Sequence, residues 1–359
     1  MNYLDCKRAF DADDFAALYE APEGIRFLKI RSFSRREYLD QVRPLLPEAQ
    51  RDLGTRLLPE AIFASGVTDA RIDDLIEGFY RMGRQVRAAD EPTLIGELTQ
   101  VEDFDWGGIY QNNLEKAIVD RYVKRLKTLA EVNAAFTDEI TPAVHAWLVA
   151  SWYNHWTSII IQDVFFDHPV VIPAVGSVKK VDFFVRNRPY DLKVTYLPED
   201  WVKECRDASG LNSEVSVLRA EARRLGYVIP RDLNGSQLLR YLWRTVDEDP
   251  SSDDLIVDSL REYRVRLVAD ASANPLPLVK WLYENQGQRR FDASHRFFLV
   301  LVNTKDFFGS WKLKRQHNHL KSEIGSYLDP PTSGSGFAVD FEWEGNAYST
   351  RADCLVISM

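Results

Sequence analysis

The alternation of apolar and polar positions predicts two short strands within residues 180–196, joined by a turn. Along a strand, successive side chains point to opposite faces. Asp191 and Lys193 therefore share one face of the second strand, and Asp182 lies between apolar residues on the first. Two carboxylates and a lysine on one face of an otherwise apolar hairpin are costly to bury, which indicates a site rather than plain core.

Elsewhere the spacing of apolar residues predicts both helices and strands. An amphipathic helix is expected over 111–130 and a largely buried helix over 142–166. The remaining elements are shorter: helices over 38–51, 71–86, 211–225, 236–246, 276–284 and 310–327, strands at 170–172, 296–302, 337–343 and 353–358, and a turn at Gly176-Ser177. This order predicts an α/β fold with a mixed central sheet flanked by helices.

Length and composition predict how the chain divides into regions and in which compartment it is located. Its 359 residues, 45% of them hydrophobic, predict a mainly helical region over 1–110 and a core over 111–359 that carries a helical insertion at about 200–290. No run of 18 apolar residues occurs, which argues against a membrane span. The beginning of the chain has no signal-peptide pattern, and three distant cysteines suit a reducing compartment, so a cytoplasmic protein is expected.

Charge is distributed unevenly along the chain. The net charge is −9, and 1–110 accounts for −7 of it. The segment 286–321 is locally basic, with eight Lys or Arg against two Asp. Such a segment suits either a surface that contacts phosphates or a solvated helix face, and charge alone favours the second.

The predicted hairpin can be tested geometrically. Asp/Glu-x-Lys is expected about twice by chance in this composition and occurs twice, so the tripeptide alone carries no information. With Asn187-Arg188 as a two-residue turn, Asp182 would face Lys193 and lie diagonal to Asp191. Two such carboxylates suit Mg²⁺, and a neighbouring lysine suits phosphodiester hydrolysis. The alternative is an ordinary Asp–Lys pair across two exposed strands.

This arrangement of a helix, an Asp on one strand and Asp-Leu-Lys on the next resembles the PD-(D/E)xK nuclease superfamily, and within it type II restriction endonucleases and related phage-defence nucleases. The resemblance covers about 145–200, with a weaker echo in 296–314. It implies that Asp182 and Asp191 are metal ligands and that Lys193 is the catalytic lysine. The family's signature proline is replaced by Val181, and the 142–166 helix lacks the usual Glu.

For the missing acid the resemblance leaves two candidates. Glu115, on the preceding helix, would be a catalytic acid supplied from upstream, and Asp163 would be a metal ligand near the end of the 142–166 helix. Glu115 ranks slightly above Asp163.

The resemblance also implies a cofactor and partners. They are Mg²⁺, with Mn²⁺ able to substitute, double-stranded DNA, a second copy of the chain as a homodimer, and a cognate DNA methyltransferase. The region 1–110 would then read DNA or mediate dimerisation. The residues expected to contact DNA are Lys179, Lys180, Arg289, Arg290, Lys312, Lys314 and Arg315.

Two other functions remain open from the sequence. One is a non-catalytic nucleic-acid-binding protein that keeps a nuclease-like core, which the missing helical Glu favours. The other is an RNase or a nickase on the same fold.

Overall fold

The computed structural model describes residues 1–102, 116, 118–231, 233, 235–287, 291 and 293–359. A six-stranded mixed sheet lies at its centre in the order β1-β2-β3-β4-β6-β5. The strands are β1 (Val171–Val178), β2 (Val181–Val185), β3 (Arg188–Tyr196), β4 (Arg296–Val302), β5 (Phe337–Trp343) and β6 (Asn346–Ser358). β3, β4 and β6 run parallel, and the other neighbours pair antiparallel. The predicted α/β fold with a mixed sheet is confirmed.

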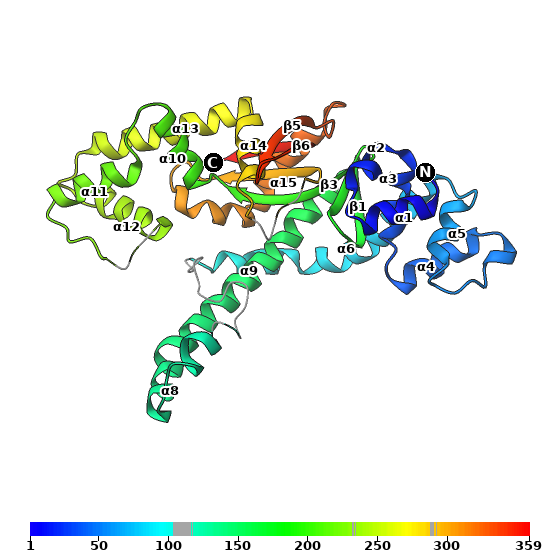
Figure 1. Ribbon diagram of the computed structural model, residues 1–359, viewed down its shortest axis with the longest axis horizontal. Coiled ribbons are helices and arrows are strands. Elements are labelled where there is room, and N and C mark those ends of the chain that lie inside the picture. The colour runs from blue at the N-terminus through cyan, green and yellow to red at the C-terminus, as the bar shows by residue number, and fades with distance from the viewer. Residues whose placement is uncertain (103–115, 117, 232, 234, 288–290, 292) are drawn as a thin grey trace.

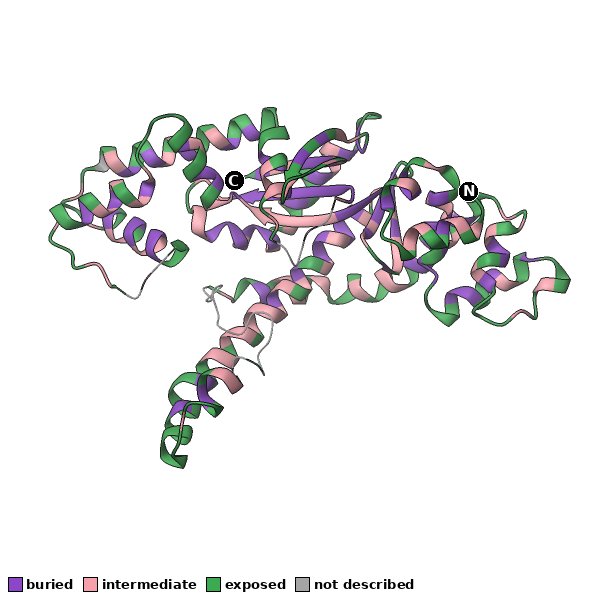
Figure 2. Cartoon of the chain, viewed as in Figure 1, coloured by how far each residue is buried: buried purple, intermediate pink, exposed green. Residues whose placement is uncertain are grey.

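Helices cover both faces of the sheet (Figure 1). On one face α9 (Thr141–Phe166) and α15 (His317–Leu328) pack against apolar side chains of β2, β3 and β4. On the other face α10 (Glu199–Ala208), α13 (Asp254–Ala273) and α14 (Leu276–Glu284) cover β4, β5 and β6. Every residue of β4 is buried, as expected for a strand covered on both faces, and Figure 2 shows this buried centre.

The N-terminal region is helical, as predicted, and packs against β1 and β2. Its helices are α1 (Tyr3–Asp11), α2 (Phe15–Glu20), α3 (Pro22–Arg31), α4 (Arg36–Val42), α5 (Leu58–Ala64) and α6 (Asp69–Thr99), with 3₁₀ turns at Arg43–Leu45 and Glu48–Gln50. The helix expected over 38–51 is therefore wrong beyond Val42, because Pro44 and Pro47 interrupt the backbone hydrogen bonds there.

The segment before α9 differs from its prediction. Residues 111–115 and 117 of the helix expected over 111–130 lie outside the described residues. Beyond them a π-helix spans Val119–Val123, and a new helix, α8 (Leu129–Ala135), begins after a break. Thr128 and Glu131 form a capping box that starts α8, so a continuous helix to residue 130 is wrong. A second π-helix, Phe136–Ile140, leads into α9, and Figure 1 shows α8 and the first half of α9 projecting from the body.

The helical insertion is confirmed and has its own small core. It consists of α10, α11 (Glu214–Arg224), α12 (Gly235–Asp247), α13 and α14. Apolar side chains of α11, α12 and α13 form one cluster. A buried ion pair at 2.6 Å joins Arg264 of α13 to Glu214 of α11. Of the described residues, no helix is long and apolar enough to cross a membrane.

Two further local predictions are corrected. Gly176-Ser177 is not a turn but part of β1, and the turn that follows contains Lys180 with φ +62°. A Cβ on Gly176 would lie within van der Waals overlap of the Ser32 carbonyl, so this glycine permits close packing of β1 on the N-terminal helices.

The helix expected over 310–327 is also two elements. A 3₁₀ helix, η6 (Phe307–Arg315), precedes α15, and Gln316 separates them with φ −84° and ψ 62°. The last strand, β6, is longer than the predicted 353–358 because it pairs with all of β5 through a hairpin.

Candidate active site

The β2–β3 hairpin closes one residue earlier than predicted. Its turn residues are Arg186 and Asn187, both with positive φ (47° and 70°), and Val185 pairs with Arg188. Two positive φ angles are typical of the tight turn that matches strand twist, and Asn adopts them readily. The Lys29 ammonium donates to the Asn187 side chain at 2.6 Å, which helps to hold this residue. The predicted Arg186–Pro189 pair is therefore wrong.

This shift changes partners but preserves faces. Phe184 pairs with Pro189 rather than with Asp191. Continued by one residue beyond Phe183 and Tyr190, the observed register places Asp182 opposite Asp191 instead of opposite Lys193. Because the pairing moved by an even number of positions, each side chain keeps its face. The two carboxylates therefore lie closer to direct opposition than the predicted diagonal.

Hydrogen bonds hold the three predicted site residues on β2 and β3. The Lys193 ammonium donates to the Asp191 carboxylate at 2.7 Å. The Leu192 backbone N–H donates to the Asp182 carboxylate at 2.8 Å. Asp191 is buried, whereas the Lys193 side chain is 44% exposed. The structure thus brings Asp182, Asp191 and Lys193 together on one face, with the lysine at the edge nearest solvent.

The electrostatics of this face favour a cation. The pKa of Asp182 is raised to about 6, chiefly by burial, and the negative charge of Asp191 and a hydrogen bond between the two side chains contribute to this rise. The Leu192 N–H and the Lys193 ammonium act in the opposite direction but do not compensate. These neighbours therefore do not fully offset the free-energy cost of ionising the buried Asp182 carboxyl group.

A further charged residue, Arg296, contacts the site. It is the parallel partner of Asp191 on β4, it is buried, and its Nε lies 3.9 Å from the Asp191 carboxylate. Its Nη2 donates to the Gln286 side chain at 2.6 Å, and its guanidinium lies 5.0 Å from the Tyr283 ring. In the sequence, Arg296 stands out only as one of the cations of the basic segment. Its position at the start of an otherwise apolar strand was an indication in the sequence that Arg296 is buried.

The third acidic ligand is not found at this face. Asp163 lies between α9 and α6, where Arg87 donates two hydrogen bonds to it, at 2.8 and 2.6 Å. The Tyr80 hydroxyl contacts the same carboxylate at 3.3 Å. Glu115, the other candidate, lies outside the described residues. Within the described part of the chain, no group of three His, Cys, Asp or Glu could hold a metal.

The donor set nevertheless suits Mg²⁺. Carboxylate oxygens are hard ligands, and Mg²⁺ is commonly bound by one or two carboxylates while water and substrate phosphate complete its coordination. Two carboxylates with one close lysine fit that pattern. Asp182 and Asp191 are the residues that would hold the ion.

The described residues among those expected to contact DNA differ in their surroundings. Lys179 is paired with Asp13 at 2.5 Å, and the Lys180 ammonium lies 4.8 Å from the Phe15 ring. Lys312 is partly exposed beside Trp311.

The other basic candidates face inward or are not described. Lys314 is buried, donates to Asn154 at 3.0 Å, and has its pKa lowered to about 8 by burial. Arg315 donates to the carbonyls of Leu98 and Val101 at 2.7 and 2.5 Å. Arg289 and Arg290 lie outside the described residues. Within the described part of the basic segment, Lys314 and Arg315 therefore contribute to packing, whereas Lys312 remains partly exposed.

Comparison with known proteins adds no relative: no protein-family model, no curated protein and no solved structure matches the chain. The site must therefore be interpreted from its own residues.

Proposed function

We propose that this protein is a metal-dependent nuclease that hydrolyses phosphodiester bonds of DNA at the face formed by Asp182, Asp191 and Lys193. The observation that carries the proposal is the pairing of two carboxylates on adjacent strands, where the pKa of Asp182 is raised to about 6 by burial and by Asp191. Such a pair costs folding free energy unless a cation or a proton neutralises it. A bound Mg²⁺ would supply that charge.

Each residue has a distinct role in this proposal. Asp182 and Asp191 would hold the ion, which when bound stabilises charge on a phosphate and acidifies a water molecule. Lys193 is the exposed cation of the group and would orient the scissile phosphate against the carboxylates. Arg296 is buried and would position the Asp191 carboxylate from the neighbouring strand.

The finer proposal is a type II restriction or phage-defence enzyme. It rests on the resemblance of the hairpin residues to the PD-(D/E)xK superfamily. Mn²⁺ would substitute for Mg²⁺ because it accepts the same oxygen ligands. Double-stranded DNA would be the substrate, a homodimer would supply two active sites for two-strand cleavage, and a cognate methyltransferase would protect the host's DNA.

Cleavage of supercoiled plasmid with millimolar Mg²⁺ tests the proposal. Wild type should produce linear DNA, and Asp191→Ala and Lys193→Ala should each lose at least about a hundredfold in rate. The chain offers a matched control, because Asp5-Cys6-Lys7 is its other Asp-x-Lys tripeptide and Lys7 is exposed. Lys7→Ala should cut like wild type. Equal rates for all four proteins would refute the catalytic assignment.

A non-catalytic nucleic-acid-binding protein is the second candidate. It is favoured by one observation, namely that the described residues supply two carboxylates and no third acidic ligand at this face. Salt-sensitive DNA binding without cleavage in Mg²⁺ or Mn²⁺ would support it. The same assay separates the variants of the first proposal, since open circles without linear product indicate a nickase, and cleavage of RNA alone indicates an RNase.

A further inference from the structure

A cleft opens where the parallel strands β3 and β4 end, on the side of the helical insertion. It has a volume of about 380 Å³ and lies between α12 and the loop that leads from β4 into η6. A second hollow of about 320 Å³ shares four of its lining residues and reaches Thr195 near the end of β3. The shared residues are Arg240, Phe307, Phe308 and Trp311. We refer to both hollows together as the α12–η6 cleft.

The position of this cleft connects it to the candidate active site. Thr195 follows Lys193 by two residues on the same strand and therefore lies on the same face, about 7 Å further along. In α/β proteins, ligands bind preferentially outside the carboxyl ends of parallel strands. If one phosphate of a nucleic-acid strand lies at Lys193, the next one or two nucleotides of that strand would lie at the cleft.

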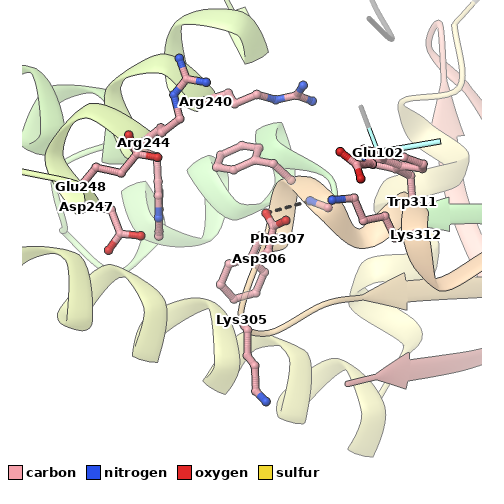
Figure 3. Close-up of a pocket in the computed structure, with 13 residues that line it drawn as sticks. Glu102, Arg240, Arg244, Asp247, Glu248, Lys305, Asp306, Phe307, Trp311 and Lys312 are labelled. Atoms are coloured by element: carbon pink, nitrogen blue, oxygen red, sulfur yellow. Dashed lines mark hydrogen bonds between the residues drawn. The ribbon is translucent and has the colours of Figure 1, made fainter. Parts of the chain in front are cut away.

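Cations line the α12–η6 cleft without ion-pair partners in the described part of the chain. Figure 3 shows Arg240 and Arg244 on α12 and, opposite them, Lys312 beside Trp311. Lys305 also belongs to the lining. Because none of these four is bound to a carboxylate within the described ranges, their charge is available to a ligand.

The carboxylates of the cleft are partly engaged elsewhere. Asp247 accepts from Arg261 at 3.1 Å, and Asp306 accepts from the Gly309 backbone N–H at 2.9 Å as the cap of η6. Glu102, Glu199 and Glu248 are the remaining acids of the lining, and Asp306 keeps its negative charge because its partner is a neutral backbone N–H. The cleft therefore offers charged groups of both signs, with cations available to phosphate oxygens and carboxylates available to N–H or O–H donors of a nucleotide.

Aromatic rings form the floor of the cleft and are held rigidly. Phe307 and Phe308 are partly exposed, and Trp243 lies behind them with ring centroids at 6.4 and 6.0 Å. The Arg264 guanidinium lies 5.1 Å from both the Trp243 and Phe307 rings. Its buried ion pair with Glu214 helps to fix this stack, and the Arg240 guanidinium lies 5.8 Å from the Phe308 ring, so the partly exposed rings are preorganised beside a cation.

We propose that the α12–η6 cleft binds one unpaired nucleotide of the substrate strand. The base would stack on Phe308, and the flanking phosphates would contact Arg240, Arg244 and Lys312. An aromatic floor with cations at its rim is the combination that recognises single-stranded nucleic acid, because an unpaired base exposes its ring face while a paired base does not. The volume lies within the range of small-molecule sites, about 300–1,000 Å³. This proposal rests on the proposed nuclease function, which identifies the bound strand as the DNA substrate.

The test measures binding separately from cleavage. The full chain carrying Asp191→Asn, which is expected to bind but not cut, is titrated with an oligonucleotide of about a dozen nucleotides that contains the fluorescent base 2-aminopurine. Stacking on the phenyl rings should quench this base. Phe308→Ala should abolish the quenching and weaken binding by about tenfold. Arg240→Ala should weaken binding by a similar factor and reduce its salt dependence.

A matched control and a second variant keep the result interpretable. Arg223 is an exposed arginine of α11 outside the cleft, so Arg223→Ala should bind like the parent. Lys312→Ala, at a partly exposed residue, provides a test that avoids any loss of packing at Phe308.

Several outcomes would overturn the proposal. Binding by Phe308→Ala, Arg240→Ala and Lys312→Ala that equals binding by Arg223→Ala would refute it. Tighter binding of a blunt duplex with no quenching, or equal affinity for free deoxyadenosine monophosphate, would also refute it, the latter by indicating a free nucleotide as ligand. Plasmid cleavage by the wild type with no effect of the cleft variants would reject the cleft and leave the nuclease standing. Quenching that depends on Phe308 without any cleavage would reject the nuclease and leave the cleft.

Discussion

Two clusters of paired carboxylates in this protein differ in how their charge is balanced. Between α6 and α9, Asp163 receives two hydrogen bonds from Arg87, and Asp167 is paired with Arg84 at 3.0 Å. On β2 and β3, Lys193 contacts Asp191 at 2.7 Å and Arg296 lies 3.9 Å from the same carboxylate, whereas Asp182 has no ion-pair partner among the described residues. In the first cluster each aspartate has an arginine at contact distance, although Arg84 also pairs with Glu91 at 2.8 Å, whereas in the second cluster Asp182 has no such cation among the described residues.

The pKa shifts express the same difference. In the α6–α9 cluster the pKa of the Arg87 guanidinium is raised, chiefly by its hydrogen bond to Asp163, so the ionised pair is the stable form. At the hairpin the pKa of Asp182 is raised instead, so ionisation is resisted. Compensated acids hold a structure together, and uncompensated acids are available to a ligand. Because arginines neutralise Asp163, we assign it a structural role, although it lies on the helix that was expected to supply the missing acidic ligand.

The largest expected effect is on cleavage. Asp191→Asn should reduce the single-turnover rate by about a thousandfold, because it removes one of the two ligand charges. Asp163→Asn should leave the rate within about threefold of wild type, because Asp163 is engaged by arginines away from the site. Both are measured below the unfolding temperature of either variant. Equal losses would mean that Asp163 reaches the reacting phosphate and that the two clusters act together.

Stability should respond in the opposite order. Asp163→Asn should lower the free energy of unfolding by about 3 kcal/mol, because two arginines near it lose a buried counterion. Asp182→Asn keeps an acceptor for the Leu192 N–H and removes a buried negative charge that no cation compensates. This substitution should therefore not lower the free energy of unfolding at neutral pH. Urea unfolding followed by circular dichroism, with a chelator present, measures both. A larger loss of unfolding free energy in Asp182→Asn than in Asp163→Asn would contradict the conclusion that the uncompensated carboxylate lies on the hairpin.

Metal binding should sharpen the contrast further. With free Mg²⁺ at about ten times its dissociation constant, the free energy of unfolding should rise by about 1.4 kcal/mol. The gain should persist in Asp163→Asn and disappear in Asp191→Asn. The urea midpoint with Mg²⁺ against chelator reports it. A gain that persists in Asp191→Asn would locate the cation elsewhere.

The smallest effect is a pH dependence without metal. Because the pKa of Asp182 is raised from 3.8 to about 6, the folded state holds this proton more tightly than the unfolded state. The corresponding stability is present below about pH 4 and is lost as the pH rises through 6, by about 1 kcal/mol between pH 5 and pH 7. The difference between wild type and Asp182→Asn isolates this contribution from other carboxyls. A difference that grows with rising pH instead would show that Asp182 is stabilised as an anion.

The hairpin could be predicted because its information is local. Alternation with a period of two determines which side chains share a face, and it does not depend on the register of the turn. The turn itself was predicted one residue too late, because Arg186 is not a residue that favours positive φ. Its guanidinium donates to the carbonyls of Pro330 and Pro331 near the end of α15, a long-range contact that no local pattern contains.

The basic segment shows the limit of charge counting. Eight cations in 286–321 suggested one surface, yet the structure buries Arg296 against Asp191 and Lys314 against Asn154. A buried cation and a solvated one have the same letter in the sequence. The aromatic cleft was missed for a related reason, since its walls come from α12 and from η6, which are separated by about sixty residues.

By itself, the sequence determined the class of fold, the apolar central strand β4 and the shared face of Asp182, Asp191 and Lys193, because hydrophobic periodicity specifies which side of an element is buried. Tertiary structure alone decided which carboxylates are neutralised. Asp163 meets Arg87 across 76 residues of chain, and Asp191 meets Arg296 across 105. Electrostatic free energy depends on distance and burial in space. The feature that distinguishes a structural acid from a candidate catalytic one therefore appears only when the chain is folded.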